Sequence, residues 1–267
     1  MKVLAISNRK GGSGKTTTAV NLAAEWGARG IRTLLVDLDS QGHAGLGFGI
    51  VAGRRDAVAH MMFTRGDFDL AAAIRPTACD NVAVVAADVS FDGSGSERGV
   101  KTLRRHLRTP AIEARFDIVI LDTPPSLDML LINALAAADA ALVPMIPHAL
   151  SAASIRQFTR LFFRMATTVQ PALKLLGILP VMVNARVLHQ QSMLQQVETE
   201  FGAGRLFDGI RADIRLAEAF AVGSPVRNVS PRSRGAEDYG RLADELDRLW
   251  PLRPCQTPRA LNSTKGA

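Results

Sequence analysis

Short apolar runs alternate along the chain with longer segments that have the apolar spacing of helices. Six of the runs have the length and composition of strands that are buried on both faces. They cover residues 3–7, 33–36, 82–86, 117–121, 141–146 and 175–183. Helical patterns separate them, of which residues 16–28 and 154–165 are the clearest. This alternation predicts the α/β class, with a mostly parallel, twisted sheet and helices on both of its faces.

The pattern also indicates how the chain is divided. Residues 49–108 are the least regular part, and residues 236–250 again have a helical pattern. Residues 251–267 follow with prolines and small polar side chains, which is typical of a frayed end. We therefore expect a single domain over residues 1–250 and a flexible tail over residues 251–267.

The segment NRKGGSGKTTT, residues 8–18, joins the first predicted strand to the first predicted helix. It matches the phosphate-binding pattern G-x-x-x-x-G-K-[ST] at Gly14, Lys15 and Thr16, but Arg9 stands where the first glycine belongs. In such a loop backbone N–H groups point at phosphate oxygens, the lysine neutralises phosphate charge, and the threonine hydroxyl can ligate Mg²⁺. The residues expected to bind nucleotide here are Gly11, Gly12, Ser13, Gly14, Lys15 and Thr16. The alternative is a glycine-rich turn without a ligand, which the order of strand, GSGKTT and helix disfavours.

Three carboxylates follow predicted strands. Asp122 in FDIVILDTPPS ends an apolar run, at the sheet edge where α/β proteins bind ligands, and such a carboxylate can hold Mg²⁺ beside a phosphate loop. A helix N-cap is the other possibility, which Pro124 and Pro125 make less favourable. Asp37 and Asp39 in VDLDSQGHA follow another strand. Because two carboxylates one residue apart point in different directions, one can reach the metal while the other orients an attacking water.

The composition indicates one class of partner and disfavours several kinds of site. The 267 residues carry a formal net charge of +7 and a pI near 10.1, which suits a polyanion or an anionic membrane surface. Cys79 and Cys255 are far apart and outside metal-ligand spacing, so neither a disulfide framework nor a zinc site is indicated. No apolar stretch is long enough to cross a bilayer. We expect a soluble protein of a reducing cytoplasm.

Three motifs together carry a family resemblance. KGGSGKTT, DLDSQGHA and DTPPS, in this order and spacing, resemble the ParA/MinD family of deviant Walker A ATPases, and most closely its small ParA-type members, the Soj-like and McdA-like proteins. The resemblance covers nearly all of residues 1–250. It implies a P-loop NTPase fold, hydrolysis of ATP to ADP and phosphate, and ATP and Mg²⁺ as ligands. It also implies a homodimer that encloses two ATP molecules, in which Lys10 reaches the phosphates of the other subunit as an arginine finger does.

The resemblance assigns catalytic and metal-binding roles to single residues. Asp39 is implied to position the hydrolytic water, and Lys10 and Lys15 complete the catalytic set. The implied metal ligands are Thr16, Asp37 and Asp122.

The resemblance also implies further contacts with the nucleotide. Thr17 is implied to lie at the α-phosphate, and Asn184 and Pro225 at the adenine, although Asn184 could equally be an ordinary strand-end residue. His148 stands where many relatives have an acidic residue, and we interpret it as a surface substitution.

A ParA-type protein would bind DNA of any sequence in its ATP form. Arginines that could hold DNA phosphates are Arg186, Arg211 and Arg215, with Arg227, Arg232 and Arg234 as further members of the basic surface. Each of them could instead be solvated or paired within the chain. The cargo could be a plasmid, a chromosome locus or a protein assembly such as a carboxysome, reached through a ParB-like or McdB-like adaptor.

Two other classes remain. A MinD-like membrane protein would need an amphipathic C-terminal helix, whereas RALNSTKGA lacks an apolar face, so we expect no membrane binding. Metabolic enzymes and iron–sulfur ATPases of related fold would need a substrate pocket or cluster cysteines. No segment precedes the first strand, so we expect no helix-turn-helix domain and a cytoplasmic, nucleoid-associated protein.

Overall fold

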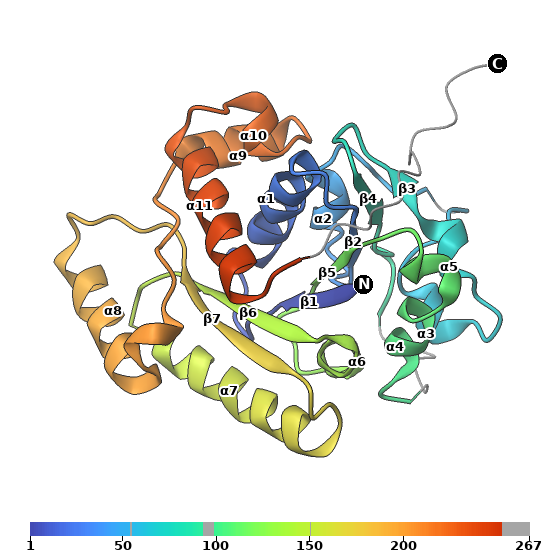
Figure 1. The fold of residues 1–267 in the computed structure, drawn as a ribbon, viewed down its shortest axis with the longest axis horizontal. Helices are drawn as coiled ribbons and strands as arrows, with labels where there is room; N and C mark the ends of the chain where they lie inside the picture. Colours follow the sequence, from blue (N-terminus) through green and yellow to red (C-terminus); the bar gives the residue numbers. More distant parts are fainter. Residues whose placement is uncertain (54, 93–98, 150, 253–267) are drawn as a thin grey trace.

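A seven-stranded sheet forms the centre of the computed structural model, which describes residues 1–53, 55–92, 99–149 and 151–252 (Figure 1). The strands are β1 (Lys2–Ile6), β2 (Thr33–Asp37), β3 (Arg75–Pro76), β4 (Val82–Val85), β5 (Ile118–Asp122), β6 (Ala140–Met145) and β7 (Lys174–Pro180). Their order across the sheet is β3-β4-β2-β5-β1-β6-β7. All neighbours are parallel except β3 and β4. The predicted parallel α/β sheet is confirmed.

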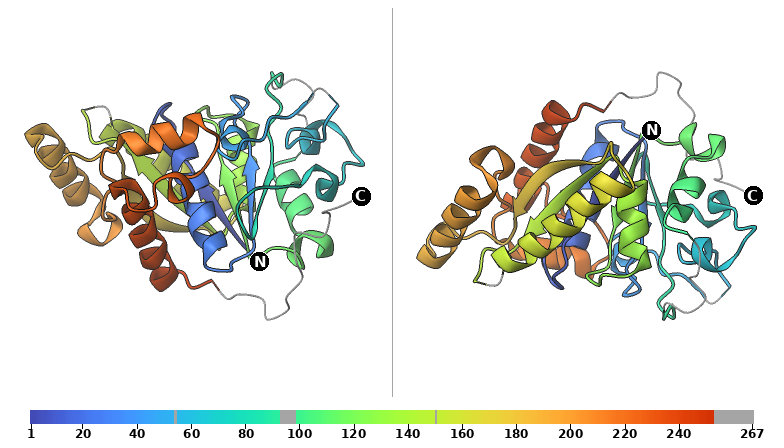
Figure 2. Two further views of the ribbon diagram at one scale, coloured as in Figure 1. Left: turned by 90° about the horizontal axis from the view of Figure 1, so that it is seen from above. Right: turned by 90° about the horizontal axis from the view of Figure 1, so that it is seen from below.

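Helices cover both faces of the sheet. They are α1 (Lys15–Ala28), α2 (His43–Leu46), α3 (Met61–Thr64), α4 (Thr102–Leu107), α5 (Pro110–Glu113), α6 (Met129–Ala137), α7 (Ser151–Thr168), α8 (Leu188–Phe201), α9 (Ile214–Ala221), α10 (Val226–Val229) and α11 (Arg234–Leu249), with short 3₁₀ turns at Leu70–Ala73 and Ala203–Arg205. Figure 1 shows α1 and α11 packed side by side above the sheet. The view from below in Figure 2 shows α6 and α7 over the opposite face.

Alternating strand residues build two separate cores. In β1, Val3 and Ala5 belong to the core under α6 and α7, whereas Leu4 and Ile6 belong to the core under α1 and α11. Successive side chains of a strand point to opposite faces, so a strand covered by helices on both sides must be apolar throughout. This is why the central strands read as unbroken apolar runs instead of alternating patterns.

Several details differ from the expectation. The two-residue strand β3 was not predicted, and it pairs antiparallel to β4 at the edge of the sheet. Helix α7 begins at Ser151, three residues before the predicted start, and the described part of the irregular segment 49–108 includes the short helices α3 and α4. Most of the predicted tail, residues 253–267, lies outside the described residues.

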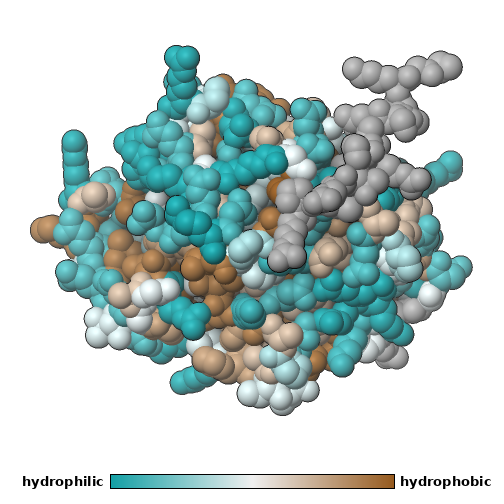
Figure 3. All heavy atoms as spheres, viewed as in Figure 1, coloured by the Kyte–Doolittle hydropathy of each residue, from teal (hydrophilic) through white to brown (hydrophobic). Residues whose placement is uncertain are grey.

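The outer surface is mostly hydrophilic on the face seen in Figure 3. Apolar atoms gather there over β7, between α8 and α11. Among the described residues, no helix combines the length and apolar character that crossing a membrane requires.

Candidate functional site

The loop between β1 and α1 has the backbone that a phosphate-binding turn needs. Gly12 and Gly14 adopt positive φ angles of 67° and 84°, and Gly14 directly precedes the first residue of α1. A Cβ at Gly14 would also lie 2.9 Å from the Val181 side chain. Glycine is therefore required at position 14 both by the turn and by the neighbouring loop. The turn exposes the backbone N–H groups at the amino end of α1.

Lys15 is directed inward by this turn. Its side chain is buried, and its Nζ donates a hydrogen bond of 3.2 Å to the carbonyl oxygen of Lys10. Burial lowers the pKa of the Lys15 ammonium, while the negative charges of Asp122 and Asp39 raise it in part. A buried cation beside orphan N–H groups is the arrangement that binds anionic phosphates.

Asp37 and Asp122 meet at the carboxyl ends of adjacent strands. They are direct partners in the parallel register of β2 and β5. Asp122 Oδ2 accepts a hydrogen bond of 2.7 Å from the Thr16 hydroxyl, and Asp37 Oδ2 accepts one of 2.9 Å from the backbone N–H of Ala44. The sheet thus brings together the three predicted metal ligands.

Burial controls the protonation of both carboxylates. It raises the pKa of Asp122 to about 7, although the Thr16 hydroxyl and the Lys15 charge lower it. Burial and the negative charge of Asp122 raise the pKa of Asp37 well above its ordinary value, against three backbone N–H groups that lower it. A divalent cation bound between these two carboxyl groups would stabilise their ionised form.

Unsatisfied polar atoms test whether the site fits Mg²⁺ and a phosphate. Asp122 Oδ1 and Ser13 Oγ are buried and have no hydrogen-bond partner among the described residues. Buried polar atoms without a partner are rare in folded proteins, because each costs free energy. A cation beside Asp122 and a phosphate oxygen beside Ser13 would satisfy them. When bound, Mg²⁺ supplies charge neutralisation at the phosphates, and Thr16, Asp37 and Asp122 are the residues that would hold it.

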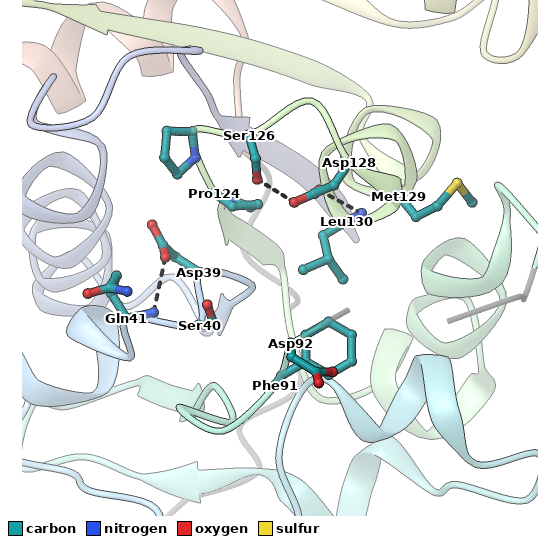
Figure 4. A pocket seen from close by; sticks show the side chains of 11 residues that line it. Asp39, Ser40, Gln41, Phe91, Asp92, Pro124, Ser126, Asp128, Met129 and Leu130 are labelled. Carbon is teal, nitrogen blue, oxygen red and sulfur yellow. Dashed lines mark hydrogen bonds between the residues drawn. The ribbon is translucent and has the colours of Figure 1, made fainter. Parts of the chain in front are cut away.

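Asp39 extends beyond the metal site on a loop that Asp37 shapes. The backbone N–H of Asp39 donates a hydrogen bond of 3.1 Å to Asp37 Oδ1, and Asp39 Oδ1 accepts a hydrogen bond of 3.1 Å from the backbone N–H of Gln41. Asp39 lines a cavity of about 520 Å³ together with Pro124 and Asp128, among other residues (Figure 4). Asp39 is therefore accessible to water from this cavity.

Lys10 lies at the rim of the site and contacts His148. Its Nζ is hydrogen-bonded to His148 Nε2 and lies 3.5 Å from Nδ1 of the same ring. Because an ammonium group can only donate, the imidazole nitrogen is the acceptor in this contact. His148 has intermediate exposure, and its ring contacts the signature lysine, which the interpretation as a surface substitution did not include.

A second cavity, of about 690 Å³, adjoins the phosphate loop. Gly14, Thr16 and Thr17 line one side of it, and Met182 and Tyr239 are among the residues of the other sides. Its mostly apolar walls suit the base and sugar of a nucleotide.

Asn184 and Pro225 are not among the described residues that line this cavity. The side chain of Asn184 accepts 3.0 Å from the backbone N–H of Arg186, and Pro225 is buried at the start of α10. Their contact with adenine stays a prediction.

The predicted DNA-contacting arginines differ in how they are paired. Arg211 is bonded to the buried Asp238 at 2.8 Å and to Glu237 at 3.1 Å, and Arg215 pairs with Glu218. Arg186 is exposed, and within the described residues its side chain has no ion pair.

Parallel strands with a phosphate loop after β1 and a buried carboxylate at the end of β5 are typical of a P-loop nucleotide-binding protein. The family model described as AAA domain matches residues 1–175. The chromosome-partitioning ATPase Soj of Thermus thermophilus is 38% identical over 245 residues, which cover 91% of this chain and 94% of that protein. The sporulation initiation inhibitor protein Soj of Bacillus subtilis is 34% identical, over 92% and 98% of the two chains.

Solved structures give the same result. Cobyrinic acid a,c-diamide synthase from Mycobacterium smegmatis, with bound ADP and magnesium, has a TM-score of 0.79 and 31% identity, over 97% of this chain and 100% of that one. McdA of Cyanothece, in its apo form, has a TM-score of 0.82 at 20% identity, over 92% and 98%, and shares the fold. The chain belongs to the ParA/MinD family of deviant Walker A ATPases. It is an ATP-hydrolysing enzyme, with ATP and Mg²⁺ as its ligands.

Some residues of the site gave no local signal in the sequence. Phe91 and Asp128 line the cavity beside Asp39, and His60 lies behind its wall in a stack with Phe91. Asp128 could have been found as an N-cap, because it precedes an apolar helical run and accepts from Leu130 and Leu131. His60 and Phe91 come from loops whose approach only the folded sheet decides.

Proposed function

We propose that this chain is a ParA-type positioning ATPase. It dimerises on ATP, binds DNA of any sequence as the dimer, and partitions or positions a cargo such as a plasmid, a chromosome locus or a protein assembly. The observation that carries the proposal is the similarity to chromosome-partitioning ATPases at 31–38% identity over more than nine-tenths of the chain.

The placement of the two lysines supports a dimer. Lys15 is buried inside its own phosphate loop, whereas the Lys10 ammonium lies at the rim, against His148. A charge held away from its own phosphates can serve a nucleotide that a second subunit presents. In this proposal, dimerisation exchanges the His148 contact of Lys10 for the phosphates of the partner.

Asp39 is the proposed water-positioning residue, because it is the solvent-facing carboxylate of the three. Asp37 and Asp122 are buried and paired across β2 and β5, which supports them as the metal ligands in this proposal. A carboxylate that orients water and leaves the metal to its neighbours contributes by positioning.

DNA binding is proposed from the net charge of +7 and the late arginines. Arg186 is the strongest contact candidate, because its charge is not balanced by an ion pair within the described residues. Arg215, whose pair with Glu218 is largely exposed, can exchange that partner at little cost. Arg211 is the weakest of the three, since Asp238 and Glu237 already hold its guanidinium.

Further parts of the proposal concern partners and location. We place the protein on the nucleoid in the cytoplasm, with a ParB-like or McdB-like adaptor that stimulates hydrolysis. Residues 1–250 would act as one domain, followed by a flexible tail.

A second candidate function is favoured by one observation. The cobyrinic acid a,c-diamide synthase chain is matched over its full length at 31% identity. An ATP-dependent amide synthesis would need a carboxylic acid substrate near the terminal phosphate. Such an enzyme would hydrolyse ATP faster with its acid and ammonia donor, and would be indifferent to DNA.

Light scattering and DNA shift assays test the proposal. Asp39→Ala at saturating Mg·ATP should accumulate as a dimer that binds unrelated duplexes, while the ADP form should bind none. A variant that binds ATP but stays monomeric would contradict the proposed switch. Binding to anionic liposomes without DNA binding would favour a MinD-like protein, and neither binding would favour the amide-forming class.

A further inference from the structure

His60 is a buried histidine close to the loop that carries Asp39. It directly precedes α3, and its side chain is 1% exposed. The ring stacks on Phe91, with 4.3 Å between the ring centroids and 22° between the planes. Phe91 in turn lines the cavity that Asp39 faces (Figure 4). The imidazole therefore lies directly behind a wall of the cavity that Asp39 lines.

The hydrogen bonds of His60 define its tautomer. The backbone N–H of Asp88 donates a hydrogen bond of 2.9 Å to Nδ1, so Nδ1 carries no proton. The remaining ring nitrogen, Nε2, lies 3.3 Å from the carbonyl oxygen of Leu38 and must donate to it. Burial lowers the pKa of His60, which agrees with a neutral ring.

The carbonyl that His60 holds belongs to the peptide unit between Leu38 and Asp39. The N–H of this unit donates a hydrogen bond of 3.1 Å to Asp37 Oδ1. In the preceding peptide unit, the N–H of Leu38 donates a hydrogen bond of 2.9 Å to the carbonyl oxygen of Asp122. A peptide unit is planar, so anchoring both its C=O and its N–H sets the direction in which the Asp39 side chain leaves the backbone.

We propose that His60 is a positioning residue for ATP hydrolysis, which fixes the Leu38–Asp39 peptide and thereby aims the Asp39 carboxylate. The inference rests on the proposed role of Asp39 in orienting water. Without the His60 donor, the buried Leu38 carbonyl loses a partner and the peptide can rotate. A misplacement of a positioning group by about 1 Å can cost on the order of 100-fold in rate.

Two matched substitutions separate the two hydrogen bonds. His60→Gln places an amide N–H near the position of Nε2 and can still donate to Leu38, but it offers no acceptor at Nδ1. His60→Asn has an acceptor near Nδ1 for Asp88 and is too short to reach Leu38. We expect His60→Asn to lower kcat by about tenfold or more, corresponding to one lost hydrogen bond. His60→Gln should stay within about threefold of the unchanged protein. ATP affinity should be unchanged in both, because neither contacts the phosphate loop.

Additivity with Asp39 distinguishes positioning from a general structural effect. The double variant with His60→Asn and Asp39→Ala should be as slow as Asp39→Ala alone, since residues that act as one unit are not additive. The control for a lost aromatic contact is His106→Asn. His106 lies on α4 and packs edge-on against Phe68. If His60→Asn fails to fold, His60→Gln and His60→Met, which have similar size but differ in the donor, carry the same comparison.

The outcomes are distinct. Slow turnover of His60→Asn with normal ATP affinity, recovery in His60→Gln and non-additivity with Asp39→Ala would support the inference. Normal turnover of His60→Asn or His60→Met beside a slow Asp39→Ala would overturn it and leave the role of Asp39 intact. Normal turnover of Asp39→Ala would overturn the proposed role of Asp39 itself, and with it the coupling.

Discussion

Replacing Asp122 with asparagine should stabilise the metal-free protein and weaken its response to Mg·ATP. Burial raises the pKa of this carboxyl from 3.8 to about 7 in the folded state. At about 1.36 kcal/mol for each pH unit, the difference corresponds to a cost of about 4 kcal/mol when the group is ionised. Asparagine removes the charge but leaves an amide with incomplete hydrogen bonds, which costs about 1–3 kcal/mol. The expected net stabilisation is about 1–3 kcal/mol.

The sign of the pH dependence follows from the raised pKa. Below 3.8 the carboxyl is protonated in both states, so wild type and variant differ little in charge. Between 3.8 and about 7 the unfolded state loses its proton first, and the folded wild type loses stability as the pH rises. The advantage of Asp122→Asn should therefore grow over this range and level off above it.

Thermal unfolding in EDTA, at about pH 5 and about pH 8, measures this difference. A gain of about 1–3 kcal/mol raises the Tm by about 2–12 °C for a chain of this size. Saturating Mg·ATP at about 100 times its Kd should add about 2.7 kcal/mol to wild type and much less to the variant. Asp67→Asn, at an exposed aspartate, is the control and should change little. A variant less stable than wild type at the higher pH in EDTA would refute the reasoning.

Three further predictions concern other parts of the molecule. Lys10→Ala should retain ATP affinity and lose ATP-dependent dimerisation, whereas Lys15→Ala should lose ATP binding. Titration with fluorescent ATP measures the affinity, and sedimentation measures the dimer. Loss of affinity in both variants would contradict the proposed contact of Lys10 with the nucleotide of the other subunit. Arg186→Glu should weaken binding to all DNA sequences in shift assays, against a wild-type salt slope of roughly −4 to −7 for on the order of 4 to 8 neutralised phosphates; an unchanged affinity would exclude Arg186. Asp117→Ala removes the carboxylate that pairs with the buried Arg32 guanidinium at 2.8 Å, and should cost about 3–5 kcal/mol in urea unfolding. A loss below about 1 kcal/mol would mean that water replaces the carboxylate.

Much of the fold could be predicted because its signals are local. The six long strands were placed within one to three residues at their ends, and the helices after residues 15 and 234 began close to the expected positions. The phosphate loop was found for the same reason, since its glycines and Lys15 are neighbours in sequence. The edge strand β3 was missed because two residues carry no periodic signal, and only its pairing with β4 makes it a strand.

Other features depend on residues that are far apart in the chain. Asp37 and Asp122 were each expected near the metal, but only the register of β2 against β5 makes them direct neighbours. Their burial in the fold then raises the pKa of both carboxyl groups. The contact of Lys10 with His148 joins the ends of β1 and β6. Sequence shows the type of each side chain, whereas proximity across the sheet decides its charge state and partner.

The sequence by itself determined the class of fold, the phosphate loop and the residue types of a magnesium nucleotide site, because each depends on spacing along a few neighbouring residues. Only the tertiary structure decided that Arg211 is held by Asp238, and that His60 anchors the peptide before Asp39. These contacts join segments more than 20 residues apart, and their geometry depends on how the strands are ordered and how the helices pack. Burial then determines their energetic weight, and burial is a property of the folded chain alone.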